Sequence, residues 1–305
     1  MCLHPNLWAV GSMEVSVSKK NVIIYFFYVP AIFLIMFFVV RPFAETVFIS
    51  LTKWNGYSPD KKFIGIKNYA DMVEDARLQK AFVNTLIYGV ASTFLQNVAG
   101  LAIAAFVDSR FKGNNIVRVV VYMPIMISGL IMGYIMYFFL TYDNGVLNDI
   151  IGVLGWGPVD WLADGKRGIL FITLINTWQY VGNCMIIYLS GMQSIPKMYE
   201  EAAVIDGAGK LQCFRFITLP LLLPAITTAV ITNLIGGLKL FDGIVSLTNG
   251  GPNYATHSMM SYLNSQYFLA EKAGYASAVG ISTFVMIMVI SLLCNRYFER
   301  KNIEE

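Results

Sequence analysis

Amide and phenol side chains recur on one face of a long apolar segment, where they could bind a polar ligand. Asn176, Tyr180 and Asn183 are spaced i, i+4 and i+7, and Gln179 lies beside them. This spacing places the three side chains on one face of a helix. Amides and a phenol offer several directional donors and acceptors above an aromatic ring, which suits a neutral ligand rich in hydroxyl groups.

A second stripe, in a later apolar segment, combines one amide with two glycines. Asn233, Gly236 and Gly237 recur at helical spacing, and the glycines could leave room for a ligand. The alternative for both stripes is that their amides form hydrogen bonds that hold the helices together, and this applies still more to Gln96 and Asn97.

Charged and small residues near these stripes have simpler interpretations. Lys239 and Asp242 are spaced i and i+3, and we expect them to pair with each other and not with a ligand. Neither stripe holds a central Arg or Lys, which an anionic ligand would favour. Gly129 and Gly133 form a G-x-x-x-G pattern, which predicts close helix packing.

Residue types that do catalytic or metal chemistry are scarce and scattered. The cysteines and histidines are Cys2, Cys184, Cys213, Cys294, His4 and His257. The cysteines show no C-x-x-C spacing, so neither a disulfide framework nor a metal site is indicated. The two histidines lie in a tail and a loop, which leaves no basis for a catalytic triad. We therefore expect no catalytic centre and no cofactor bound by this chain.

The segments that carry both stripes are expected to be transmembrane helices. Of the 305 residues, 56% are hydrophobic and 13% are charged, and the mean hydropathy is +0.59, which is typical of an integral membrane protein. Apolar runs long enough to cross a hydrocarbon core of about 30 Å, without strand-like alternation, predict an all-α bundle, and no broken helices in paired positions are indicated. The six expected spans lie at about 21–41, 81–107, 117–141, 168–190, 214–240 and 275–297.

One domain is expected, a six-span bundle over residues 21–297 between cytoplasmic tails at 1–20 and 298–305. The first run is too long for a secretory signal and is followed by Arg41 and Pro42, so we interpret it as a span. Basic residues beside the first and last spans favour cytoplasmic termini, although six basic residues within 52–80 argue the other way. Met13 opens a polar stretch and could be the true start.

The segment 142–166 connects the third and fourth spans. Val146, Leu147 and Ile150 have helical spacing, and Trp156 and Trp161 follow. This pattern predicts a short helix at the outer membrane interface, with aromatic anchors. A packed external loop is the alternative. The net charge of +3 is spread over short loops, so no basic face for nucleic acid is expected.

The most specific pattern lies between the fourth and fifth spans, at about 191–220. It reads Glu201-Ala202-Ala203, then Gly207 after three residues, then Ile217-x-Leu219-Pro220 after nine more. Pro196 suits the start of a short helix at about 197–206, and Asp206 with Gly207 suits its end. The two alanines would let another protein approach the backbone, and the glutamate offers a charge to a basic partner.

This spacing resembles the E-A-A-x3-G-x9-I-x-L-P loop of ABC importer permeases. In that family the short helix docks in a cleft of the ATP-binding subunit and transmits its closure to the spans. The resemblance implies an ATPase-coupling loop that comprises Glu201, Ala202, Ala203, Asp206, Gly207, Leu219 and Pro220. An ordinary amphipathic connector is the alternative.

Other segments resemble sugar-transport permeases, specifically compact members of the larger, maltose-transporter type. They are Phe63-Ile-Gly-Ile-Lys-Asn-Tyr69, Asn176-Thr-Trp178, Thr248-Asn-Gly-Gly-Pro252 and Gly274-Tyr-Ala-Ser-Ala278. The resemblance runs from the first span to the C-terminus, without the large second external domain of the maltose protein. The Asn of the Asn-Thr-Trp motif lies at the sugar site in that relative, which makes Asn176 the leading candidate for ligand contact.

The resemblance implies an inner-membrane importer of a sugar or oligosaccharide that works by alternating access. Its expected partners are a second, unlike permease, two ATP-binding subunits and an extracytoplasmic solute-binding protein. Gly207-Ala-Gly209-Lys210 superficially resembles a phosphate-binding loop, but the pattern needs Gly at 204 and Ser or Thr at 211, and this chain has Val204 and Leu211. ATP and Mg would therefore be used by the partner subunits. Glycerol phosphate or another small polar solute is the alternative cargo, and an ion-coupled carrier is disfavoured because the acidic residues cluster at span ends and in loops.

Overall fold

The structure is a computed structural model that describes residues 28–109 and 112–300. Cys2, His4 and the possible start at Met13 lie outside these residues. The chain forms two compact units, Met1–Phe48 and Ile49–Glu305, and the candidate sites lie wholly within the second unit. Helices account for most of the described residues, so the predicted all-α fold is confirmed.

Four single helices and two bent helix pairs within the described residues are long and apolar enough to cross a membrane, which agrees with six spans. The single helices are Tyr28–Ser50, α4 (Ala76–Asp108), α8 (Gly165–Ser194) and α15 (Ala273–Glu299). The first comprises η1 (Met36–Val40) and α2 (Arg41–Ser50) in its later part, so it runs past the expected end at 41. A π-helical turn directly before Pro42 accommodates this residue without an N–H.

The third and fifth spans are each bent. In the third, α5 (Asn114–Tyr122) and η2 (Met123–Met126) meet α6 (Gly129–Leu140) at 99°. In the fifth, α10 (Lys210–Cys213), η3 (Phe214–Thr218) and α11 (Leu219–Leu221) meet α12 (Leu223–Leu238) at 67°. Pro124 and Pro224 lie at these bends, where a missing N–H interrupts the helical hydrogen bonds. The two bent spans do not occupy corresponding positions in two halves of the chain.

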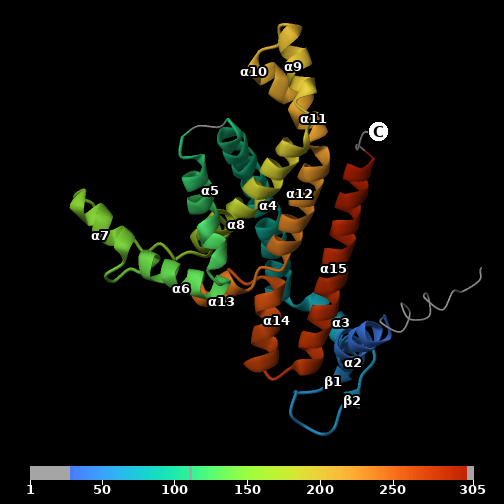
Figure 1. The fold of residues 1–305 in the computed structure, drawn as a ribbon. Coiled ribbons are helices and arrows are strands. Elements are labelled where there is room, and N and C mark those ends of the chain that lie inside the picture. The colour runs from blue at the N-terminus through green and yellow to red at the C-terminus, as the bar shows by residue number, and fades with distance from the viewer. Residues whose placement is uncertain (1–27, 110–111, 301–305) are drawn as a thin grey trace, which may run out of the picture. The chain divides into compact units, whose positions relative to one another are not determined.

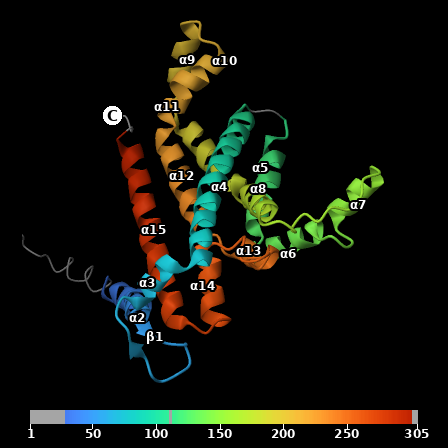
Figure 2. The same cartoon turned by 180° about the vertical axis from the view of Figure 1, so that it is seen from behind.

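Short elements complete the fold of the second unit. They are β1 (Thr52–Lys53), β2 (Lys62–Phe63), α3 (Lys67–Glu74), α7 (Val146–Val153), α9 (Met198–Ile205), α13 (Asp242–Leu247) and α14 (Met259–Phe268). The strands pair antiparallel, with Thr52 opposite Phe63. Both views place α9 and α10 at one end of this unit and β1, β2 and α3 at the other (Figure 1, Figure 2).

The centre of the unit is formed by α4, α8 and α12, which bury apolar side chains such as Tyr188 and Met185 against one another. Gly237 on α12 lies directly against α4, since a Cβ there would be 2.7 Å from Ser92 Oγ and 2.9 Å from Gly89 Cα. In a lipid bilayer no hydrophobic effect drives helices together, so their association depends on close packing. Small residues such as these glycines allow the backbones to approach closely.

The G-x-x-x-G pattern of the third span also packs a helix closely, as predicted. A Cβ at Gly133 would lie 1.7 Å from Ser246 Oγ, and one at Gly129 would lie 2.8 Å from Asp242 Cβ. These contacts hold α6 against α13. They fix the second half of the third span beside the segment that follows the end of α12.

Two segments that resemble sugar-transport permeases meet around Thr52 and have structural roles there. Asn68 donates its amide hydrogens to the carbonyl oxygens of Ser50 (2.7 Å) and Thr52 (2.9 Å). A Cβ at Gly274 would lie 2.0 Å from the same Thr52 oxygen, so only glycine allows α15 to begin here. These motif residues position the strand end of the unit.

Asp75 joins three helices at that end of the unit. Its carboxylate accepts hydrogen bonds from the hydroxyls of Tyr262 on α14 (2.6 Å) and Tyr275 on α15 (2.7 Å). It also caps α4 by accepting from the backbone N–H groups of Arg77 and Leu78. Burial raises the pKa of this carboxyl, but the four hydrogen bonds outweigh burial and hold the pKa below its usual value.

We expect D75A to lower the melting temperature of the purified protein by on the order of 5–10 °C, because it removes a helix cap and the acceptor for two tyrosines. A lowered pKa stabilises the fold fully above the ordinary value of 3.8 and loses that effect as pH falls through the folded-state pKa. The difference in melting temperature between D75A and the parent protein should therefore become smaller below pH 4. D143A, at an exposed carboxylate in the segment before α7, is the control, and equal melting of D75A and parent would contradict the assignment.

Candidate functional site

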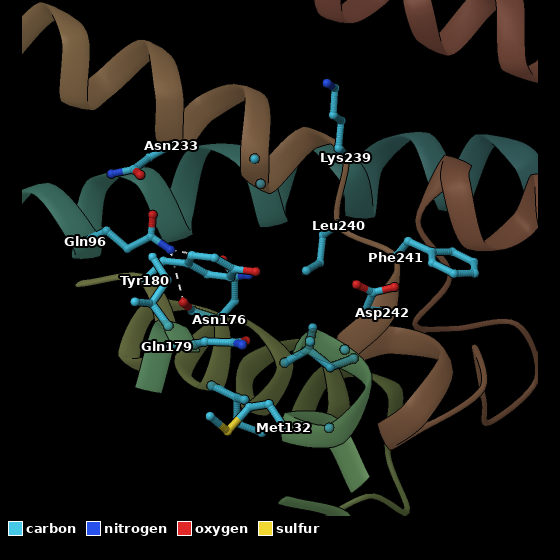
Figure 3. Close-up of a pocket in the computed structure, with 18 of the residues that line it drawn as sticks. Gln96, Met132, Asn176, Gln179, Tyr180, Asn233, Lys239, Leu240, Phe241 and Asp242 are labelled. Carbon is cyan, nitrogen blue, oxygen red and sulfur yellow. Dashed lines mark hydrogen bonds between the residues drawn. The ribbon is translucent and has the colours of Figure 1, made fainter. Parts of the chain in front are cut away.

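A cavity of about 330 Å³, lined by apolar side chains and by several amide groups, lies among α4, α6, α8 and α12 and the segment that leads into α13. Figure 3 shows side chains from these helices converging on it. Its lining includes every residue predicted for the substrate pathway: Asn176, Gln179, Tyr180, Asn183, Asn233, Gly236 and Gly237. The two stripes thus face one cavity. Contact of these residues with a ligand stays a prediction.

The amide of Asn176 is both part of the cavity and part of a bond between helices. Gln96 on α4 donates from Nε2 to the backbone oxygen (3.1 Å) and to Oδ1 (3.0 Å) of Asn176 on α8. The structural alternative and the ligand-binding one are therefore compatible for this residue, since its Nδ2 makes no bond among the described residues. Asn97 is different: it accepts from the hydroxyl of Tyr188 and donates to Thr93 at 2.7 Å, and it does not line the cavity.

Gln179 links the cavity to the bend in the third span. Its Nε2 donates to the carbonyl oxygen of Ile127 at 2.9 Å, in the extended stretch between η2 and α6. A carbonyl freed by a helix break at membrane depth needs such a donor. The sequence stripe identified Gln179 as polar and inward-facing, but this partner depends on a bend that the stripe does not indicate.

Tyr180 and Asn183 are half-buried, and neither side chain makes a hydrogen bond within residues 28–109 and 112–300. Asn233 is buried and donates to the thiol of Cys184. Gly236 opens onto the cavity, since no atom lies within 4 Å of the position of its Cβ. Gly237 instead contacts α4. Open space therefore lies beside Gly236 and not beside Gly237, and its use by a ligand stays a prediction.

Lys239 and Asp242 do not pair with each other, and that prediction is wrong. Within the described ranges the salt bridge found is Arg41–Glu45. Helix α12 ends at Leu238 and α13 begins at Asp242, so the i, i+3 spacing of one helix does not apply. Both residues line the cavity. The carboxylate lies against the start of α6, with Oδ2 3.0 Å from the position of a Cβ at Gly129, where the helix dipole favours a negative charge.

The predicted coupling loop has the expected local structure. Helix α9 runs over Met198–Ile205, after Pro196, and ends at Asp206 and Gly207, as the sequence indicates. Gly207 has φ +84°, a conformation that L side chains rarely adopt. A π-helical turn precedes Pro220, the same adjustment that precedes Pro42.

The surface of this loop is exposed and apolar. Val204 is 64% exposed, Ile205 85% and Leu211 78%. Glu201 and Ala202 are also exposed, and Ala203 is half-buried. Exposed apolar residues of this kind are typical of interaction surfaces, and docking of the loop on another protein stays a prediction.

Residues 96–303 match the family described as binding-protein-dependent transport system inner membrane component. The chain belongs to this family. Among similar proteins, it is 32% identical to the probable ABC transporter permease protein YurN of Bacillus subtilis, over 93% of this chain and 98% of that one. It is 31% identical to the trehalose/maltose transport system permease protein MalF of Thermococcus litoralis, over 88% and 91%.

Solved structures give the same picture of this inner membrane component. A chain of a bacterial ABC transporter involved in the import of the acidic polysaccharide alginate superposes with a TM-score of 0.81 at 25% identity, over 92% of this chain and 96% of that one. A chain of the MetNI methionine ABC transporter shares the fold, with a TM-score of 0.56 at 16% identity. The resemblance to importer permeases seen in the sequence is confirmed at the level of family and fold.

The short helix predicted after the third span of this membrane component is present as α7, and the two tryptophans that follow it differ. Trp161 donates to Asn148 Oδ1 at 3.0 Å and contacts the ring of Phe171 edge-on, which indicates packing against the protein. Trp156 is 69% exposed, as an interfacial anchor would be. Its place at the membrane interface stays a prediction.

Proposed function

We propose that this chain is the transmembrane permease subunit of an ATP-driven, binding-protein-dependent importer of a sugar or oligosaccharide. The observation that carries the proposal is the cavity in which Asn176, Gln179, Tyr180 and Asn183 face Asn233 and Gly236. Its amides and phenol match the hydrogen-bonding needs of sugar hydroxyls. The similarity to a protein named for trehalose and maltose transport supports the choice of cargo.

ATP chemistry belongs to partner subunits in this proposal. The exposed α9 loop, from Glu201 to Gly207, docks on an ATP-binding subunit, and Leu219 and Pro220 continue its connection to α12. Two such subunits bind ATP and Mg and drive alternating access. A second, unlike permease completes the pathway, and an extracytoplasmic solute-binding protein delivers the cargo.

Both chain termini are cytoplasmic in this proposal, and the domain is one six-span bundle over residues 21–297 with tails at 1–20 and 298–305. In both views the end of α15 lies at the same end of the second unit as α9 (Figure 1, Figure 2). Arg296 and Arg300 sit at that end, which fits the positive-inside rule. The proposed location is the bacterial inner membrane.

Uptake of labelled maltose, trehalose and glycerol 3-phosphate tests the cargo, in cells that lack this chain and in the same cells with it restored. We expect uptake of at least one of the two sugars to fall roughly tenfold without the chain and to survive a protonophore but not ATP depletion. Loss of glycerol 3-phosphate uptake alone would favour the alternative cargo. Protonophore-sensitive uptake would favour an ion-coupled carrier and contradict the proposal.

A further inference from the structure

We infer that His257 is a positioning residue for one wall of the cavity, and that protonation of its imidazole loosens this wall. The residue lies between α13 and α14, outside the cavity lining, and the proposed function does not use it. The inference rests on the proposed function only in taking sugar uptake as one of its readouts.

The ring of His257 is buried among aromatic side chains and backbone. The residue is 6% exposed, and its ring centroid lies 5.4 Å from that of Tyr254 and 5.9 Å from that of Tyr262. The ring also packs directly against the backbone at Gly250, where a Cβ would lie 2.1 Å from it. An imidazole packed in this way has little room to turn.

This ring joins the cap of α14. Its Nδ1 lies 2.9 Å from Ser261 Oγ. Ser258 is the N-cap residue, and its Oγ accepts from the N–H of Ser261 at 3.2 Å while Ser261 Oγ accepts from the N–H of Ser258 at 2.9 Å. His257 therefore contacts a capping box, whose reciprocal hydrogen bonds fix where the helix begins.

The same cap holds part of the cavity wall. Ser258 Oγ donates to the carbonyl oxygen of Leu240 at 2.6 Å. Leu240 lies between α12 and α13 and lines the cavity, as Figure 3 shows. Because this residue lies between two helices, its carbonyl oxygen relies on a side-chain donor. Two serines thus connect the ring of His257 to the cavity.

The hydrogen bonds of the cap suit an uncharged ring. The Leu240 oxygen only accepts, so the hydroxyl hydrogen of Ser258 points to it. The nearest acceptor for the hydroxyl of Ser261 is then His257 Nδ1, at 2.9 Å, with the Ser258 carbonyl oxygen at 3.2 Å. A protonated ring carries a hydrogen on Nδ1, so its bond to Ser261 would have to reverse inside the capping box.

The charges around the ring also disfavour protonation. His257 lies at the N-terminus of α14, where the helix dipole is positive. The titratable groups in contact with the ring are Tyr254 and Tyr262, and the segment 248–256 contains no charged residue. Arg77 lies 4.2 Å from the ring centroid of Tyr254, and Asp75, which bonds Tyr262, already accepts four hydrogen bonds. A charged imidazole would therefore find no free carboxylate among these groups.

Acid should weaken the contact of His257 with the cap. Burial lowers the pKa of His257 below its ordinary value of 6.5. The stability that an uncharged ring provides is therefore fully present above 6.5 and is lost as pH falls through the folded-state pKa. In the proposed topology the fifth and sixth spans are joined on the outer side, so the pH of the medium acts on this residue.

Melting of the purified complete assembly at about pH 7.5 and about pH 5 tests the contribution to stability. H257N keeps an acceptor for Ser261 and does not titrate in this range. Asn84 donates to the backbone oxygen of residue 257 at 3.0 Å, so the segment stays tied to α4 in the variant. The melting temperature of the parent should fall by roughly 2–4 °C more than that of H257N on acidification. H4N, which changes the other histidine, should behave as the parent does, and equal losses in the parent and H257N would overturn the inference.

A thiol at Gly236 reports on the cavity wall without any cargo. No atom lies within 4 Å of the Cβ position there, so G236C opens onto the cavity. Its labelling rate with methyl methanethiosulfonate, divided by the rate in the G236C/H257N chain, should rise roughly threefold between about pH 7.5 and about pH 5 as the wall loosens.

S258A tests whether the wall responds through the bond to Leu240. In the G236C/S258A chain the labelling rate relative to G236C/H257N should be raised at both pH values, because the bond is absent at both. S265A changes another serine of α14, outside the cavity lining, and should keep the response of the parent. A ratio that does not change with pH in the parent, or one that rises equally in S258A, would overturn the positioning role.

Uptake kinetics separate this inference from the proposed function. In liposomes that contain the complete assembly, acid outside should raise the KM for maltose or trehalose roughly fivefold more in the parent than in H257N. Equal changes of KM in these two chains would contradict the inference. Absence of uptake of either sugar at neutral pH, together with pH-dependent labelling of G236C, would count against the sugar cargo and support the role of His257.

Discussion

G207V should abolish ATP-driven uptake while the chain still inserts into the membrane. Gly207 has φ +84° at the end of α9, and a non-glycine residue in that conformation costs about 1–3 kcal/mol. Nothing lies within 4 Å of the Cβ position, so the cost comes from the backbone and not from a clash. The loop would relax to another conformation and turn α9 away from its docking geometry.

The measurements are sugar uptake, the amount of chain in the membrane, and recovery of ATP-binding subunits on affinity purification of the chain. We expect uptake and recovery to fall at least tenfold with normal membrane insertion. G209V is the matched control, because Gly209 has φ −75° and its Cβ would meet only Gln212 Oε1 at 3.6 Å. Normal uptake by G207V, or equal losses in both variants, would remove the support for a coupling role.

Local pattern was enough to predict the features that depend on neighbouring residues. The bounds of α9 follow from Pro196 and Gly207, whose backbone preferences act within one turn. The convergence of Asn176, Tyr180 and Asn183 on one side follows from the helical period alone. The apolar runs predicted the number of spans because the bilayer sets a minimum length for each helix.

Features that depend on distant partners could not be predicted in the same way. Asp75 bonds Tyr262 and Tyr275, which are 187 and 200 residues away along the chain. Gly237 contacts α4 and Gly236 does not, although the two adjacent residues give one signal in the sequence. Lys239 and Asp242 failed to pair because a helix break separates them, and an i, i+3 rule assumes a continuous helix.

The bends connect the cavity with the parts of the chain expected to move. Gln179 holds the Ile127 carbonyl at the bend of the third span while its oxygen faces the cavity. The fifth span breaks at Pro224, between the coupling loop and the cavity wall. Under the proposed function, a change in either the ligand or the docked partner would act on a segment where helical hydrogen bonds are already interrupted.

N176L should raise the KM of sugar uptake or abolish uptake, with little loss of stability. The substitution keeps the branched shape of the side chain and removes the Nδ2 donor, together with the Oδ1 acceptor of Gln96. Loss of one or two ligand hydrogen bonds at about 1–3 kcal/mol corresponds to roughly tenfold to hundredfold weaker binding. Stability is spared because Gln96 keeps its bond to the backbone oxygen of residue 176 at 3.1 Å.

N97L, at the position after Gln96 on α4, is expected to have the opposite effects. Asn97 accepts from the buried hydroxyl of Tyr188 and does not line the cavity, so its loss leaves that hydroxyl without an acceptor. N97L should lower the melting temperature and leave the KM of uptake near that of the parent chain. If Asn176 contacts the ligand and Asn97 holds helices together, N176L should change the KM alone and N97L should change the melting temperature alone. An unchanged KM in N176L, or the same KM change in both variants, would mean that the polar face of α8 serves packing alone.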